Sequence, residues 1–238
     1  MSADNAFRLW KNGFHGAIGS LMGFFRKDRH PDTKEFKNDE AKKTRLLAIL
    51  SNTEKAKALQ ENHSFPLAFD AWQKVSSGCI ELLNTATEKE SNKKIAYRHL
   101  IFSTYGMGYC AYRQGEIDVA LKILEPAARK WWNDEKINIL YGVCLMDTKS
   151  GIYRKNPHEA ICQAYPFLKI IETPTIEIED SIAAAALFHL ATIYRTPDIP
   201  NANVDLAASC LCLQRASTLS KNIGNPATAR LTKEETFP

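Results

Sequence analysis

The residues best suited to chemistry are six histidines and six cysteines, dispersed along the 238 residues of the chain. The histidines are residues 15, 30, 63, 99, 158 and 189, and the cysteines are residues 79, 110, 144, 162, 210 and 212. No HExxH or CxxC pair occurs, and these are spacings at which two side chains reach one metal ion. Cys210 and Cys212 lean toward different faces of a helix. The sequence therefore predicts no metal site, and packing roles for His99 and His189 beside apolar neighbours.

Glycine and serine patterns that serve catalysis are also missing from the sequence. Gly106 and Gly108 lie inside a helical pattern rather than after a strand, so they do not form the turn that holds a dinucleotide. No GxSxG nucleophile elbow is present. We therefore predict a chain that is not an enzyme and that carries no cofactor.

Composition and charge are those of an ordinary soluble protein, with 45% hydrophobic and 24% charged residues. No run approaches the roughly 20 apolar residues that span a bilayer, and the polar start does not resemble a secretory signal. Residues 1–60 hold 12 Lys/Arg and 7 Asp/Glu, hence +5, and the remaining residues hold 19 and 20, hence −1. This asymmetry is too weak to predict nucleic-acid binding. The scattered cysteines favour reduced thiols and a cytoplasmic location.

Apolar residues recur at helical spacing through most of the chain. Helices are expected over residues 5–26, 39–61, 65–84, 92–113, 116–131, 134–147, 157–171, 180–195 and 203–221, with a short one at 225–232. Ser64 and Asn156 are placed to cap two of them, because Pro66 and Pro157 follow in the first helical turn. The alternating stretch 175–179 is short and is predicted to be a linker. The predicted fold class is all-α, with antiparallel helix pairs.

The most informative stretch is residues 105–127, which reads as a helical hairpin. A first helix rich in small residues ends at Arg113-Gln114-Gly115, where the glycine allows a left-handed turn. A second helix follows with Ala120, Leu124 and Ala127 on one stripe. Small residues let two helix backbones approach closely, so the two helices should pack against each other.

Residues 101–134 resemble a tetratricopeptide repeat. The small and apolar positions of its signature correspond to Thr104, Met107, Gly108, Ala111, Ala120, Leu124 and Ala127, and Gly142 follows Gly108 by the 34-residue period. The stretch 184–220 is similar to the longer-looped Sel-like repeat, with Leu190–Tyr194, Asp205 and Ala216-Ser217 at its signature positions. The resemblance implies a right-handed helical-repeat solenoid over residues 91–225. Residues 1–30 would form an amphipathic helix, 31–90 an irregular helical part, and 226–238 a tail.

In such repeats the first helix of each pair lines a concave groove that binds other proteins. The resemblance implies that the groove is lined by Phe102, Tyr105, Tyr109, Tyr112, Arg113, Lys136, Ile139, Val143 and Met146. Aromatic and arginine side chains are common anchors of interfaces, although the tyrosines could instead pack between helices. Tyr105 and Tyr109 stand where related domains carry a clamp for a carboxylate, so that clamp is absent.

Residues 5–26 carry an apolar stripe of Phe7, Trp10, Phe14, Ile18, Leu21 and Phe25. Four glycines weaken this helix, so the stripe needs a surface on which to dock. The three candidates are its own fold, the groove of a partner protein, and a membrane surface, which the basic residues flanking the stripe would favour.

The function expected from these features is a non-catalytic protein-binding scaffold. The repeat resemblance suggests an adaptor, a secretion-associated chaperone, or an inhibitor or immunity protein for a toxin or effector. The alternative is a peripheral membrane or effector protein anchored by the 5–26 helix, and an enzyme on a helical scaffold is the third and weakest reading. The expected partner is another protein, bound by a monomer or homodimer.

Overall fold

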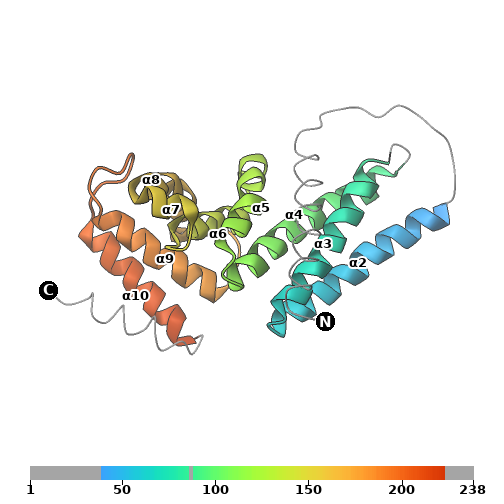
Figure 1. The fold of residues 1–238 in the computed structure, drawn as a ribbon, viewed down its shortest axis with the longest axis horizontal. Coiled ribbons are helices and arrows are strands. Elements are labelled where there is room, and N and C mark those ends of the chain that lie inside the picture. The colour runs from blue at the N-terminus through green and yellow to red at the C-terminus, as the bar shows by residue number, and fades with distance from the viewer. Residues whose placement is uncertain (1–38, 86–87, 223–238) are drawn as a thin grey trace. The chain divides into compact units, whose positions relative to one another are not determined.

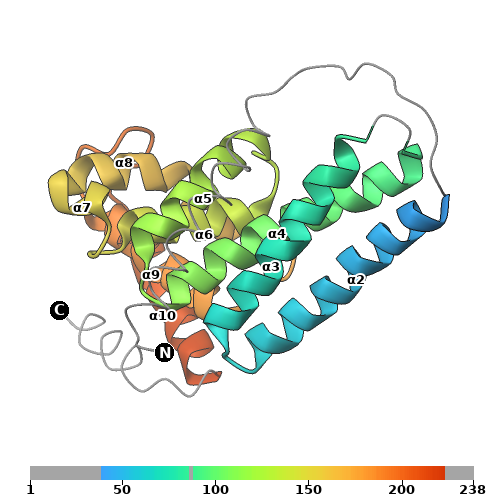
Figure 2. The same ribbon diagram turned by 45° about the vertical axis from the view of Figure 1, so that its right-hand side comes forward.

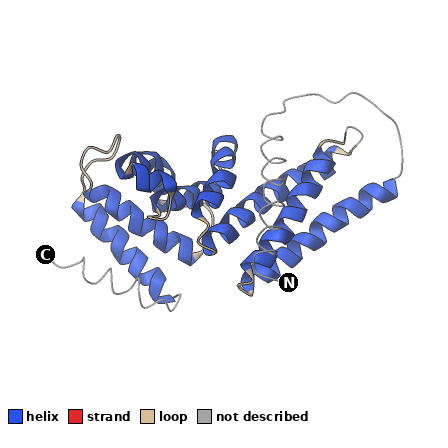
Figure 3. Cartoon of the chain, viewed as in Figure 1, coloured by secondary structure: helices blue, strands red, loops and turns tan. Residues whose placement is uncertain are grey.

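Helices are the regular elements of the part of the chain that the structure describes. The computed structural model describes residues 39–85 and 88–222, and in these residues helices alternate with loops and no strand occurs (Figure 3). The predicted all-α class is therefore confirmed, and stretch 175–179 is a linker as expected. The apolar stripe from Phe7 to Phe25 and the expected helices at 5–26 and 225–232 lie outside the described residues.

The chain divides into two units between Lys130 and Trp131. The first unit contains α2 (Asp39–Glu61), α3 (Phe65–Leu83), α4 (Glu90–Arg113) and α5 (Ile117–Lys130). The second contains α6 (Glu135–Met146), α7 (Gly151–Lys155), α8 (Pro157–Leu168), the 3₁₀ turn η1 (Lys169–Glu172), α9 (Asp180–Arg195) and α10 (Leu206–Asn222). In the first unit α4 packs closely on α3. The expected domain boundary between residues 90 and 91 stays a prediction.

In the first unit α3 packs against both α2 and α4, as Figures 1 and 2 show. The indole of Trp72 on α3 is buried, and its Nε1 donates a hydrogen bond of 3.1 Å to Oε1 of Gln60. A Cβ atom added at Gly106 of α4 would lie only 2.4 Å from Cε2 of that ring. The glycine therefore lets the α4 backbone rest on the indole, and this contact holds the two helices together.

The turn between α4 and α5 is closed by Gly115, which has a φ of 77°. The Gly115 amide donates to the carbonyl of Tyr112, and the Glu116 amide donates to the carbonyl of Ala111. These are the two hydrogen bonds of a Schellman motif, which satisfies the last carbonyls of a helix. Beyond the turn α5 packs back on α4, where a Cβ atom at Gly108 would lie 2.6 Å from Cδ2 of Leu124. The hairpin predicted from residues 105–127 is therefore present.

In the second unit α6 is buried along nearly its whole length, from Ile137 to Met146. It packs against α8 and α9. A Cβ atom at Gly142 would lie 2.9 Å from Cγ of Leu168 on α8, so this glycine also permits a close helix approach. Asp134 is the N-cap residue of α6, and its side chain accepts a hydrogen bond of 3.0 Å from the Ile137 amide.

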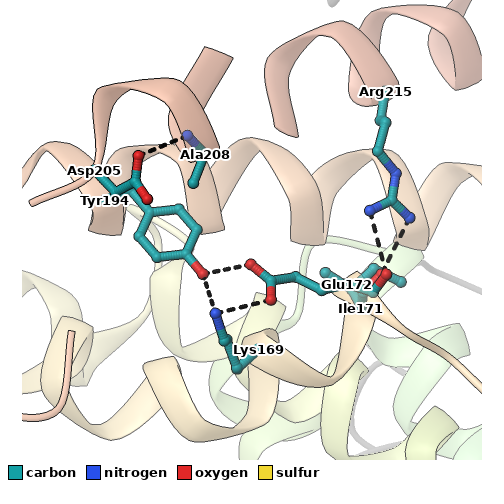
Figure 4. Close-up of polar contacts among 7 residues, drawn as sticks. All are labelled: Lys169, Ile171, Glu172, Tyr194, Asp205, Ala208 and Arg215. Atoms are coloured by element: carbon teal, nitrogen blue, oxygen red, sulfur yellow. Dashed lines mark hydrogen bonds and ion pairs between the residues drawn. The ribbon is translucent and has the colours of Figure 1, made fainter. Parts of the chain in front are cut away.

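The last helix pair, α9 and α10, is joined through a small-residue contact. Oγ of Ser209 donates a 3.0 Å hydrogen bond to the carbonyl of Ala191, and it accepts one of 3.0 Å from Nε of Arg195. Asp205 precedes α10 and its side chain accepts from the Ala208 amide at 2.9 Å, as a capping residue does (Figure 4). These polar contacts link α10 to α9 and satisfy a backbone amide in the first turn of α10.

Three local expectations had different outcomes. Asn156 caps α8 as predicted, since its Oδ1 accepts from the Glu159 amide at 3.2 Å. Ser64 occupies the N-cap position of α3 as predicted, and its backbone carbonyl accepts from the Ala68 amide at 2.9 Å, but its side chain makes no capping hydrogen bond. The short helix α7 stands where only a loop was expected. The Ser150 hydroxyl starts it by accepting from the Ile152 amide at 3.2 Å.

The linker before α9 is held by one carboxylate, Glu135. It accepts hydrogen bonds from the Thr175 amide at 2.9 Å, the Thr175 hydroxyl at 2.6 Å and the Ile176 amide at 3.3 Å. The hydroxyl of Thr175 and these amides lower the pKa of Glu135, because they stabilise the ionised form.

We expect Glu135→Gln to release this linker while leaving the helices in place. Hydrogen exchange should then become faster at the Thr175 and Ile176 amides and stay unchanged in α6. In the wild-type protein the same release should occur as the pH falls below the ordinary pKa of 4.5 toward the lowered value, because protonation removes the acceptor charge. Equal exchange of the linker in both proteins at neutral pH would contradict this assignment.

Candidate protein-binding site

The candidate surface in the first unit is an aromatic and arginine cluster at the carboxyl end of α4. It consists of Phe65 at the start of α3 and Tyr105, Tyr109 and Arg113 on α4; we call it the Arg113 cluster. The rings of Tyr105 and Tyr109 are stacked with centroids 6.1 Å apart, and Phe65 meets Tyr109 edge-on at 6.0 Å. Tyr105, Tyr109 and Arg113 follow one another at intervals of one helix turn, so the geometry of α4 places their side chains on the same face.

Arg113 ties the cluster together. Its Cζ lies 4.8 Å from the ring centroid of Phe65 and 5.5 Å from that of Tyr109, and its Nη1 donates a 2.5 Å hydrogen bond to the Tyr109 hydroxyl. Guanidinium groups are attracted to ring faces, and the hydrogen bond holds the charge in place. Tyr109 is buried, whereas Tyr105 is half-buried and Arg113 is exposed. The cluster therefore presents a fixed cation beside an aromatic surface.

Two further predicted residues lie on the same helix. Phe102 is 52% exposed, which is high for a phenylalanine, and it contacts the ring of His99 edge-on at 6.1 Å. Tyr112 is half-buried. The structure thus brings Phe102, Tyr105, Tyr112 and Arg113 to the accessible side of α4 and places Tyr109 beneath them.

The predicted residues of the second unit have a different environment. Ile139, Val143 and Met146 are buried, and Lys136 is half-buried at the start of α6. Their helix is apolar on all sides and packs within its unit, so these three side chains are core residues. That Lys136 belongs to the same binding surface as α4 stays a prediction.

A polar network that the sequence did not predict joins η1, α9 and α10 (Figure 4). The Tyr194 hydroxyl accepts a hydrogen bond from Nζ of Lys169 and donates one to Glu172, and Lys169 forms an ion pair of 2.8 Å with Glu172. From α10, Arg215 donates to the backbone carbonyls of Ile171 and Glu172 at 3.3 and 3.4 Å. Arg215 thereby satisfies carbonyl groups at the end of a helical segment, where the backbone leaves them without partners.

The pKa values of Tyr194 and Lys169 favour a structural role for this network rather than a role in acid–base chemistry. Burial, and then the hydrogen bond to Glu172, raise the pKa of Tyr194 to about 12. Burial opposes the charge of Lys169, but its bonds to Glu172 and Tyr194 outweigh this and raise the pKa of Lys169. Tyr194 therefore stays protonated and Lys169 stays charged near neutral pH, so neither is prepared to act as a base or nucleophile.

The histidines expected to pack lie in the helices. Nδ1 of His99 lies 3.0 Å from Oγ1 of Thr53 on α2, and burial lowers the pKa of His99. Burial likewise lowers the pKa of His189 on α9, to about 4. Among residues 39–85 and 88–222, no group of three or more His, Cys, Asp or Glu side chains could hold a metal ion.

No helix in the described ranges is both long enough and apolar enough to cross a bilayer. No model of a protein family, no curated protein and no solved structure matches the chain.

Proposed function

We propose that this chain is a protein-binding scaffold built of tetratricopeptide-like and Sel-like helix pairs, and that the accessible side of α4 binds the partner. The observation that carries the proposal is the Arg113 cluster together with exposed Phe102. Aromatic and arginine side chains supply most of the binding energy in protein interfaces. A cation held against two rings loses little side-chain freedom on binding, which favours association.

The repeated use of glycine supports the repeat architecture. Gly108 of α4 lies against Leu124 of α5, and Gly142 of α6 lies against Leu168 of α8. In each case a glycine of the first helix admits a leucine of the next long helix, as expected for equivalent positions of two repeats. At the third pair Ala191 has the corresponding small side chain and meets Ser209.

Site-specific photocrosslinking tests the binding surface in the cells that produce the protein. A photoreactive residue at position 102 should give a discrete protein adduct, because Phe102 is exposed beside the cluster. The same residue at Lys122, an exposed position on α5, serves as the matched control. In a Tyr105→Ala, Arg113→Ala background the adduct from position 102 should fall about tenfold or more, since loss of one anchor costs at least 1–2 kcal/mol.

The helical content of the variants should match that of wild type by circular dichroism, because Tyr109 and the core are left unchanged. Equal adducts from positions 102 and 122 would mean that α4 is not the binding surface. An adduct that survives the double substitution undiminished would remove the Arg113 cluster from the interface.

A further inference from the structure

A histidine and a cysteine lie together on α8, outside the surface described above. His158 and Cys162 are one helix turn apart, and Sγ of Cys162 lies 3.7 Å from Nδ1 of His158. The histidine is exposed and the cysteine is half-buried, so the pair is reachable from solvent. Asn156 and Gln163 are bonded to the intervening Glu159, which keeps its carboxylate engaged on the neighbouring part of the helix.

The separation of the two atoms matches that of two ligands on one zinc ion. Zinc–sulfur bonds are about 2.3 Å and zinc–nitrogen bonds about 2.0–2.1 Å, and a tetrahedral angle between them places sulfur and nitrogen about 3.6 Å apart. The observed 3.7 Å needs almost no movement of either side chain. The sequence predicts no metal site because it contains neither HExxH nor CxxC, and a histidine and a cysteine four residues apart belong to neither motif.

Cys162 differs from the other cysteines in being both accessible and next to a histidine. Cys79, Cys110, Cys144 and Cys212 are buried, and burial raises the pKa of each. A thiol must lose its proton to bind a metal, so these four are poor ligands. The remaining cysteine, Cys210, is exposed on α10, a helix that contains no histidine.

We propose that His158 and Cys162 form a two-ligand chelating site for a zinc-class divalent cation. On binding, the cation replaces the thiol proton, which leaves to solvent, and bonds form to Sγ of Cys162 and Nδ1 of His158. The two other tetrahedral positions remain for water or for a ligand atom of another molecule. The site is open, and its affinity is lower than that of a closed four-ligand structural site.

Titration of the untagged full chain with Zn²⁺, in competition with a chromophoric chelator, tests the proposal. Wild type should bind the ion, and His158→Gln and Cys162→Ser should each lower the affinity at least about tenfold, the lower end of the loss for an outer-shell contact. Cys210→Ser is the matched control and should bind as wild type does. Titration with Co²⁺ adds a signature, because thiolate ligation gives a near-ultraviolet charge-transfer band.

The band should appear in wild type and in Cys210→Ser and disappear in Cys162→Ser. All three substitutions are at exposed or half-buried positions, so circular dichroism should report unchanged folding. Absence of the cobalt band in wild type would overturn the proposal and leave a simple hydrogen bond between the two side chains. Affinity that is unchanged in His158→Gln, or lost in Cys210→Ser, would equally overturn it.

Discussion

Gly106→Ala is expected to destabilise the first unit by about 1–3 kcal/mol, the usual range for overpacking a core. Helix propensity acts in the opposite direction, since alanine inside a helix is favoured over glycine by about 1 kcal/mol. The new methyl group would lie 2.4 Å from the Trp72 ring, which is buried and held by Gln60. The ring has little freedom to move, so we expect the clash to exceed the gain in propensity.

Urea unfolding gives the free-energy change, and hydrogen exchange in α3 and α4 locates it. Gly78→Ala is the matched control in the same unit, because its methyl group would meet only the Ile49 side chain at 3.1 Å. Its stability should change little or rise. In a Trp72→Phe background the Gly106→Ala substitution should cost less, because the smaller ring leaves room. A stabilised Gly106→Ala protein would show that the indole does not restrict this position.

Acidification from pH 7 to pH 4 is expected to lower stability by about 3 kcal/mol through His189 alone. Burial lowers the pKa of His189 to about 4, from an ordinary value of 6.5, and the charge of Asp147 only partly opposes this. Between these two values the unfolded chain binds a proton that the folded chain does not. The contribution of His189 to stability is therefore constant above about pH 6.5 and falls as the pH decreases toward 4.

His189→Gln removes the titrating imidazole, so the free energy of unfolding of the variant should depend less on pH between 6.5 and 4 than that of wild type. The comparison uses the slope of stability against pH, which a constant loss of packing energy does not alter. If wild type and variant have equal slopes between pH 6.5 and 4, the fold does not keep the His189 ring neutral.

Local features of the fold could be predicted because their causes are local. The 3.6-residue period of apolar side chains located the longer described helices but not α7, and Gly115 and Asn156 marked a turn and a helix start. The part of Tyr194 in the Lys169–Tyr194–Glu172 network could not be predicted, because Tyr194 lies more than 20 residues from both partners and no spacing rule relates them. The hydrogen bonds between Glu135 and Thr175 could not be predicted for the same reason, because these residues are 40 positions apart.

The candidate site was only partly predictable for a related reason. Helices α4 and α6 are apolar on most sides, and such a pattern does not tell which stripe faces a neighbouring helix. Phe102 and Arg113 proved accessible, whereas Ile139, Val143 and Met146 are in the core. Arg113, at the carboxyl end of α4, lies over the ring of Phe65, at the start of α3, and this pairing follows only from the helix arrangement.

The burial of α6 on every side constrains how the second unit can form. A helix with no polar face gains its stability from neighbours, and those of α6 are supplied by α8 and by α9, which begins at Asp180. During synthesis residues 137–146 leave the ribosome well before α9 does, with apolar side chains uncovered on several sides. The second unit can therefore complete the burial of α6 only after α9 has been synthesised.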